Sequence, residues 1–111
     1  KDLIGPVWEP FLAQELTAAG IEYRQQYQAN GFYLDFAMFP DAGTGRKNGR
    51  MVNIEVDGES YHRDSSGALR EEDVHRDQIL KANGWTVRRF WVYELREEFD
   101  RCLSIIRELL R

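Results

Sequence analysis

The residues of this sequence most able to do chemistry are two acids on one strand-like segment, with a histidine five residues after the second. In Met51–Asp57, apolar and β-branched residues alternate with polar ones, as in a β-strand. Because strand side chains alternate between faces, Glu55 and Asp57 are expected to point the same way. Adjacent carboxylates repel unless a cation or a shared proton offsets their charge. Gly58 ends the segment, and His62 follows the turn.

Two further acids are placed to join this pair. Asp35 interrupts the apolar stretch 31–39, and an aspartate there is costly to bury unless something binds it. Neighbouring strands lie about 5 Å apart, so Asp35 can lie beside Glu55 in a suitable register. Glu9 shares a helical face with Leu12. The alternatives are an acid on the exposed side of a strand for Asp35, and an acid favoured by the helix dipole for Glu9.

Three or four converging carboxylates would form a site of hard oxygen ligands. Such a site suits Mg²⁺ or Mn²⁺ and suits zinc poorly. The only nitrogen and sulfur candidates for zinc are His62, His75 and Cys102, and Cys102 falls on an apolar helical stripe typical of a core position. A divalent ion held by carboxylates commonly acts on phosphate, where it lowers the pKa of a bound water.

The elements that must position these residues can be predicted from periodicity. We expect a helix from about Glu9 or Pro10 to Gly20, because Pro10 is a poor interior helix residue. Two strands should follow at 21–28 and 31–39, joined by a tight turn. The remaining expected elements are a loop at 40–49, a strand at 51–57, a helix at 69–83, a strand at 85–93 and a helix at 99–110. This α-β-β-β-α-β-α order predicts an α/β sandwich with a small mixed sheet, its fourth strand parallel to a neighbour.

Length and composition set the broad class. With 111 residues and 42% hydrophobic residues, the chain fits one globular domain, which we interpret as excised from a larger protein. The net charge of −4 argues against a passive nucleic-acid coat. We find no membrane span or signal peptide, and a single core cysteine indicates a reducing compartment, so we expect a cytoplasmic protein.

The order Glu9, Asp35, Glu55-x-Asp57 resembles the PD-(D/E)xK nuclease superfamily. Within it, the chain is similar to very-short-patch-repair endonucleases and to small domains appended to bacterial helicases. The stretches that carry the resemblance cover most of the chain: WEPFLAQELTAAGI, QYQANGFYLDF, NIEVDGESYH and REEDVHRDQILKANGWTVRRFW. They include a glutamine nine residues before the strand aspartate (Gln26) and a helix-strand unit matched by Asp73, Arg76, Leu80, Gly84 and Trp85. The superfamily lysine is absent, and Asp57 occupies its place.

The resemblance implies a restriction-endonuclease-like fold and a Mg²⁺- or Mn²⁺-dependent endonuclease acting on DNA in repair, restriction or defence. Asp35 and Glu55 would ligate the metal, together with the Val56 carbonyl. The roles it implies for the other site residues are a proton acceptor from the attacking water (His62), residues that complete or orient the ligand set (Glu9, Asp57 and Gln26) and a contact to substrate phosphate (Arg76). Arg63 and Lys47 are further candidates for contacts to substrate phosphate.

Three alternatives accompany this interpretation. The chain could be a catalytically silent module that keeps the fold to bind nucleic acid or a protein, or a scaffold domain with solvated acids. Arg76 could be a structural residue, or pair with Asp73 three positions earlier on the helix. The basic residues Arg46, Lys47 and Arg50 could simply be a solvated loop. Expected partners are DNA, a helicase or other domains of a parent protein, and a second copy of the chain for cutting both strands.

Overall fold

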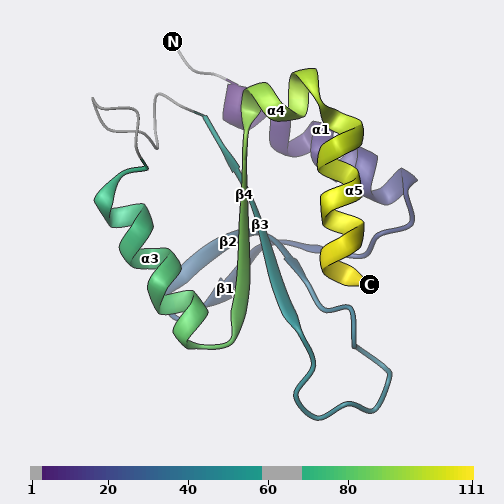
Figure 1. Cartoon of the computed structure of the whole chain (residues 1–111), viewed down its shortest axis with the longest axis vertical. Coiled ribbons are helices and arrows are strands. Elements are labelled where there is room, and N and C mark those ends of the chain that lie inside the picture. Colours follow the sequence, from purple (N-terminus) through teal and green to yellow (C-terminus); the bar gives the residue numbers. More distant parts are fainter. Residues whose placement is uncertain (1–3, 59–68) are drawn as a thin grey trace.

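The computed structural model describes residues 4–58 and 69–111, which form a four-stranded mixed sheet with helices on both faces (Figure 1). This confirms the predicted α/β class. Within the described residues, no helix has the length and apolar character needed to cross a membrane. The elements are α1 (Ile4–Ala18), β1 (Arg24–Ala29), β2 (Phe32–Met38), β3 (Met51–Asp57), α3 (Glu71–Ala82), β4 (Trp85–Trp91), α4 (Val92–Glu97) and α5 (Phe99–Leu110).

Helix α1 begins earlier than predicted. It starts at Ile4 and contains Pro10, which we had expected to mark its beginning. Pro10 is exposed, and the helix continues through it although proline has no N–H to donate to the preceding turn. The helix ends as predicted near Gly20, whose φ of 76° is left-handed. The N–H of Ile21 then bonds to the Leu16 carbonyl at 2.9 Å, which closes the helix end.

The sheet order is β1-β2-β3-β4. A tight turn at Asn30 and Gly31, with φ of 53° and 85°, joins β1 and β2 as an antiparallel hairpin, as the sequence predicted. Strand β3 is antiparallel to β2 and parallel to β4. Helix α3 provides the crossover between β3 and β4, which confirms the predicted parallel pair.

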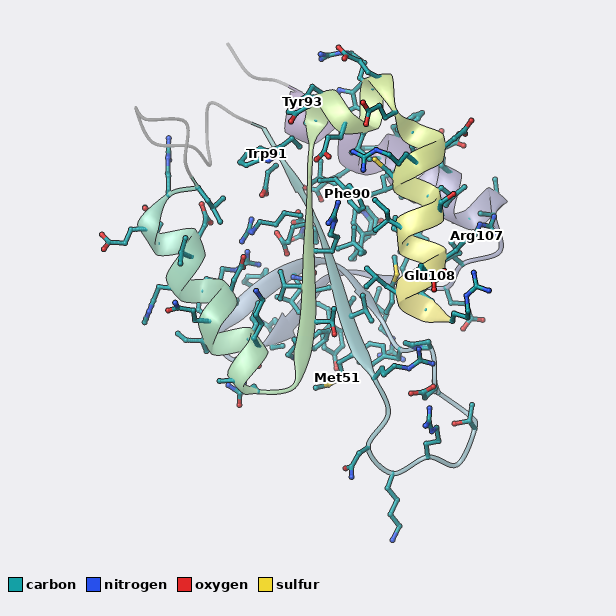
Figure 2. The ribbon with its side chains drawn as sticks, in the orientation of Figure 1. Met51, Phe90, Trp91, Tyr93, Arg107 and Glu108 are labelled. Carbon is teal, nitrogen blue, oxygen red and sulfur yellow. The ribbon has the colours of Figure 1, made fainter. Side chains whose placement is uncertain are left out.

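The main hydrophobic core lies between the sheet and the helices α1, α4 and α5 (Figure 1). Phe36, Ile54 and Phe90 are fully buried there (Phe90 is labelled in Figure 2). Cys102 of α5 is also fully buried, as predicted for a core residue. These residues fix β2, β3 and β4 in place, so the opposite face of β3 is held by a rigid support.

That opposite face of β3 is covered by α3 and is strongly polar. Its buried residues are Asn53, Glu55 and Asp57, which alternate with the apolar residues of the main core. A smaller apolar cluster around Leu80 and Trp85 packs one end of α3 against the sheet. Charged contacts therefore attach much of α3 to the sheet.

The chain after β4 differs from the prediction. We expected strand 85–93, but β4 ends at Trp91 and the short helix α4 follows immediately. Val92 and Leu95 of α4 are both buried in the main core. The Glu94 carboxylate accepts a hydrogen bond from the Trp91 N–H at 2.9 Å and fixes the start of this helix. Tertiary burial has overridden the strand-like residue types at this point.

Candidate functional site

The backbone ladder between β2 and β3 ends where the two acids predicted to meet are found. The ladder pairs Met38 with Val52 and Phe36 with Ile54. Continuing this register places Asp35 opposite Glu55 on neighbouring strands. The two acids therefore lie close together, as expected from their positions along β2 and β3.

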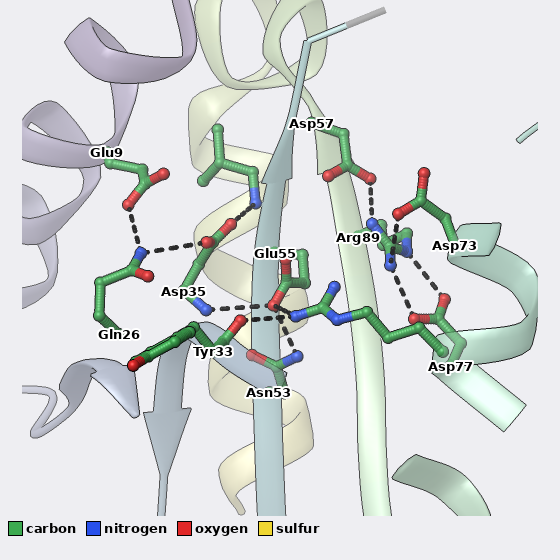
Figure 3. A network of polar contacts seen from close by, with 12 residues as sticks. Glu9, Gln26, Tyr33, Asp35, Asn53, Glu55, Asp57, Asp73, Asp77 and Arg89 are labelled. Carbon is green, nitrogen blue, oxygen red and sulfur yellow. Dashed lines mark hydrogen bonds and ion pairs between the residues drawn. The ribbon is translucent and has the colours of Figure 1, made fainter. Parts of the chain in front are cut away.

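Beyond this point, hydrogen bonds from side chains to the backbone replace the backbone ladder between β2 and β3. The Asp35 carboxylate accepts a hydrogen bond from the Val56 N–H at 3.0 Å, and the Glu55 carboxylate accepts one from the Asp35 N–H at 3.1 Å. Each acid thus bonds to the backbone of the other strand (Figure 3). In an extended strand the N–H and C=O of one residue face the same neighbour, so the Val56 carbonyl also faces the Asp35 side.

Gln26 connects this pair to α1. Its amide nitrogen donates to Glu9 Oε1 at 3.2 Å and to Asp35 Oδ1 at 3.3 Å (Figure 3). Gln26 has a φ of 50°, which is unusual for a residue with a side chain, and the β1–β2 register skips it and Asp35. A strained backbone that is kept in place by its surroundings is typical of functional positions.

The protonation of the acids follows from burial and from their neighbours. Burial raises the pKa of Asp35 to about 8, and the nearby charge of Glu55 acts in the same direction. Burial also acts to raise the pKa of Glu55, but the hydrogen bond and charge of Arg76 outweigh it, so this pKa lies below its usual value. Burial raises the pKa of Glu9, and the Glu55 charge adds to that effect. At neutral pH we therefore expect Asp35 to be protonated and Glu55 to be ionised.

Arg76 of α3 holds Glu55. Its Nη2 donates to Glu55 Oε2 at 3.1 Å and to the Tyr33 carbonyl at 2.7 Å, and its guanidinium lies over the Phe32 ring. Asn53 donates to the same Glu55 oxygen at 2.8 Å. Three donors, counting the Asp35 N–H, thus converge on Oε2. Arg76 reaches across to the sheet, as an inward-facing position on α3 allows.

Asp57 belongs to a second group of charges. Arg89 of β4 donates to Asp57 Oδ2 at 2.7 Å and makes two bonds to Asp77 of α3, at 2.8 and 2.7 Å. Asp73 also lies 3.9 Å from Arg89. Asp57 is fully buried, and the side chain of Arg89 is 9% exposed. Burial acts to lower the pKa of Arg89, but its hydrogen bonds to Asp77 and the charge of Asp57 raise it above its usual value.

The expected cage of three or four converging carboxylates is not found in the part of the chain that the structure describes. No group of three or more acid, histidine or cysteine side chains there is arranged to hold a metal ion. The reason is that cationic or amide groups separate the acids: Arg89 draws Asp57 away from Glu55, and Gln26 lies between Glu9 and Asp35 (Figure 3). The two acids that do meet are Asp35 and Glu55.

Among the other predicted site residues, the structure describes only those outside 59–68. His62, proposed to accept a proton, and Arg63, proposed to contact phosphate, fall outside the described residues. Lys47 is exposed in the loop before β3, at the opposite end of that strand from Asp57. His75, considered as a zinc ligand and set aside, is exposed on α3. The described site therefore consists of acids and their positioning groups.

Three contributors were not anticipated from the sequence: Asn53, Asp77 and Arg89. Asn53 precedes Glu55 by two residues, so the period of the strand could have placed it on the acidic face. Arg89 stands in the strand-like WTVRRFW, where an arginine at a buried position needs an acid partner. Arg89 pairs with Asp57 and Asp77 because of how α3 packs against the sheet. Sequence periodicity alone does not predict that packing.

A small mixed sheet that opens around paired acids, with helices on both faces, corresponds to the restriction-endonuclease-like class expected from the resemblance. A comparison with protein families agrees: the family model of REase_MTES_1575, a restriction-endonuclease-like family, matches residues 8–110. The match covers nearly the whole chain, so the chain belongs to this family. None of the curated proteins matches the chain. Placement near the very-short-patch-repair and helicase-associated branch stays a prediction.

Proposed function

We propose that this chain is a divalent-metal-dependent nuclease domain that hydrolyses phosphodiester bonds, with DNA as substrate. The observation that carries the proposal is the pair of half-buried Asp35 and buried Glu55, each bonded to the backbone of the other's strand where the ladder between β2 and β3 ends. Family membership supports the nuclease class. The metal, the substrate and the roles of individual residues are our inference from the site.

The donor set fits Mg²⁺ or Mn²⁺. Asp35, Glu55 and the Val56 carbonyl offer hard oxygen atoms, and Mg²⁺ usually takes one or two carboxylates while keeping several waters. Glu55 uses Oε2 for its three hydrogen bonds, so Oε1 would be its ligating oxygen. The raised pKa of Asp35 also fits, because two close carboxylates without a cation resist full ionisation.

When bound, the metal would neutralise phosphate charge and make a water molecule more acidic. The chain's own residues would supply the rest of the chemistry. Gln26 would hold Asp35 in position and keep Glu9 close to it, while Arg76 and Asn53 would fix the orientation of Glu55. His62 would accept the proton of the attacking water in its neutral form. Asp57, bonded to Arg89, would support the site rather than ligate the metal.

Calorimetric titration with Mn²⁺, paired with plasmid nicking with and without chelator, tests the proposal. Wild-type protein should bind Mn²⁺ and nick only without chelator. Asp35→Asn should lose both properties, whereas Asp100→Asn, which changes an exposed acid of α5, should keep them. Nicking that is equally strong with chelator, or in Asp35→Asn, would refute the metal-dependent mechanism.

A silent binding module is the second candidate, and one observation favours it. Arg76 already pairs with Glu55, and Arg89 already pairs with Asp57, so both acids of β3 have a cationic partner without a metal. Such a module would bind DNA with the same affinity in Mn²⁺ and in chelator, and it would not nick plasmid. The same pair of assays therefore separates the two candidates.

A further inference from the structure

We propose that the loop between β2 and β3 is a second contact site for the DNA phosphate backbone, away from the carboxylates; this inference rests on the proposed function. The loop spans residues 39–50 and projects beyond the end of the sheet (Figure 1). Its charged residues are three bases, Arg46, Lys47 and Arg50, and one acid, Asp41. The whole chain has a formal net charge of −4, whereas this loop has a net positive charge.

The loop is held in a defined shape by its one acid. The buried Asp41 carboxylate accepts bonds from the Arg50 N–H at 2.8 Å, from Arg50 Nε at 3.1 Å and from Arg50 Nη2 at 2.8 Å. Arg46 reaches the same carboxylate at 3.3 Å. Arg50 Nη1 also donates to the Arg111 carbonyl at 2.6 Å, which ties the loop to the end of α5. Because the loop is fixed before binding, its ordering costs little on contact with a ligand.

The exposed part of the loop is basic, and its backbone is accessible. The Arg46 side chain is 64% exposed despite its contact with Asp41, and Lys47 is exposed. Gly43 and Gly45, with φ of 79° and 83°, have open space where a side chain would stand. Together these residues line a hollow of about 590 Å³. Cations around accessible backbone amides suit phosphate oxygens.

The end of α5 extends the same basic surface. Exposed Arg107 lies in the last turn of this helix, and Arg111 follows it with a side chain that is 76% exposed (Figure 2). Glu108 offsets part of this charge through its contact with Arg111 at 2.9 Å. The surface therefore keeps a net positive charge at one end of the molecule, where it would attract a polyanion.

The spacing fits a duplex that reaches both sites. Lys47 and Glu55 are eight residues apart, and an extended chain spans at most roughly 3.6 Å per residue, or about 29 Å. One turn of B-form DNA is about 34 Å long. A backbone contact at the loop would thus fall within one turn of the cleaved bond. It would position the duplex without reading its sequence.

Fluorescence anisotropy with a labelled 20-base-pair duplex tests this inference. The measurements use the uncleaving Asp35→Asn protein in chelator, over a series of salt concentrations. Replacing both Arg46 and Lys47 by Ala should weaken binding by about tenfold at low salt, and should reduce the log–log salt slope by about 2, close to 0.9 for each lost phosphate contact. The matched control is Arg96→Ala, an exposed arginine of α4 near the opposite end of β4, which should change neither quantity.

Each result decides the question. Unchanged affinity and slope in the folded double variant would overturn the inference, even if the wild type nicks plasmid. Weakened duplex binding would support it, even if no nicking is found and the proposed nuclease function fails. Competition with inorganic phosphate at matched ionic strength distinguishes a site for the DNA backbone from a site for free phosphate. Displacement of the duplex by millimolar phosphate would show a free-phosphate site and overturn the backbone assignment, whereas no displacement supports it.

Discussion

Replacing Asp35 by Asn in the metal-free protein should stabilise the fold, and the gain should grow with pH. The amide oxygen of Asn can still accept the Val56 N–H, so the contact between the strands is kept. What the substitution removes is a half-buried carboxyl group that must hold a proton beside ionised Glu55. The effect on stability is therefore electrostatic.

The sign follows from the pKa of Asp35, which rises from 3.8 to about 8 through burial and the charge of Glu55. Between these values the folded protein holds a proton that the unfolded chain has released. The stability that this proton contributes is fully present below pH 4 and is lost as pH rises toward 8. One proton corresponds to about 1.4 kcal/mol per pH unit. From pH 5 to 7, the advantage of Asp35→Asn over the wild type should thus grow by about 2–3 kcal/mol.

Urea unfolding in chelator at pH 5, 6, 7 and 8 measures this difference. Asp41→Asn is the matched control, since hydrogen bonds from Arg50 hold the pKa of Asp41 well below its usual value. Asp41 is ionised in both folded and unfolded protein across this range. Its replacement should therefore destabilise the fold by an amount that does not change between pH 5 and 8.

Two results would refute the reasoning. A constant difference between Asp35→Asn and wild type across the range would mean that the Asp35 carboxyl titrates normally in the folded protein. A variant less stable than wild type at pH 7 would mark this acid as a structural anchor whose charge is needed. In either case the pair would not carry the repulsion that a cation is expected to relieve.

Three further predictions concern other parts of the site. Arg89→Met should cost about 3–5 kcal/mol in urea unfolding, because the buried Asp57 and the half-buried Asp77 both lose their hydrogen bonds to the guanidinium; a loss below 1 kcal/mol would contradict this. His62→Ala should lower plasmid nicking by about 10²-fold, with Mn²⁺ affinity in calorimetry unchanged; full activity would assign His62 to packing. Gln26→Gly should be more stable than Gln26→Ala by about 1 kcal/mol in thermal unfolding, because glycine accepts the left-handed backbone, and equal stability would argue against strain there.

Much of the fold follows from local patterns. Placing Asp35 and Glu55 on neighbouring strands predicted that they would meet, and Asn30 with Gly31 predicted the hairpin turn. Predictions from sequence patterns failed where tertiary packing determines the secondary structure. Val92, in the strand-like WVYEL, enters a helix because the core buries it beside Leu95. A helix-period or strand-period count does not contain that information.

The sequence was sufficient to predict which acids contribute to the site. It was not sufficient to predict which cationic residues pair with them. In β2, Leu34 packs in the cluster near α3 while Phe36, two residues later, packs in the main core, so simple alternation does not hold around Asp35. The partners of Glu55 and Asp57 come from α3 and β4, and their choice depends on how these elements pack. Sequence spacing alone therefore suggested a cage of acids where the structure has two groups of acids, each held by an arginine.

The mutual contact of Asp35 and Glu55 with each other's strand has an evolutionary consequence. These acids take the place of backbone pairing, so a lineage released from selection for cleavage would still be under selection to keep hydrogen-bond acceptors at both positions. If the proposed function holds, exchange of Asp35 for its amide would preserve the fold while ending metal binding, and it would be the simplest single step from an enzyme to a silent module. Among descendants of such a domain, an aspartate or an asparagine at this position would report on recent selection for catalysis more directly than retention of the fold does.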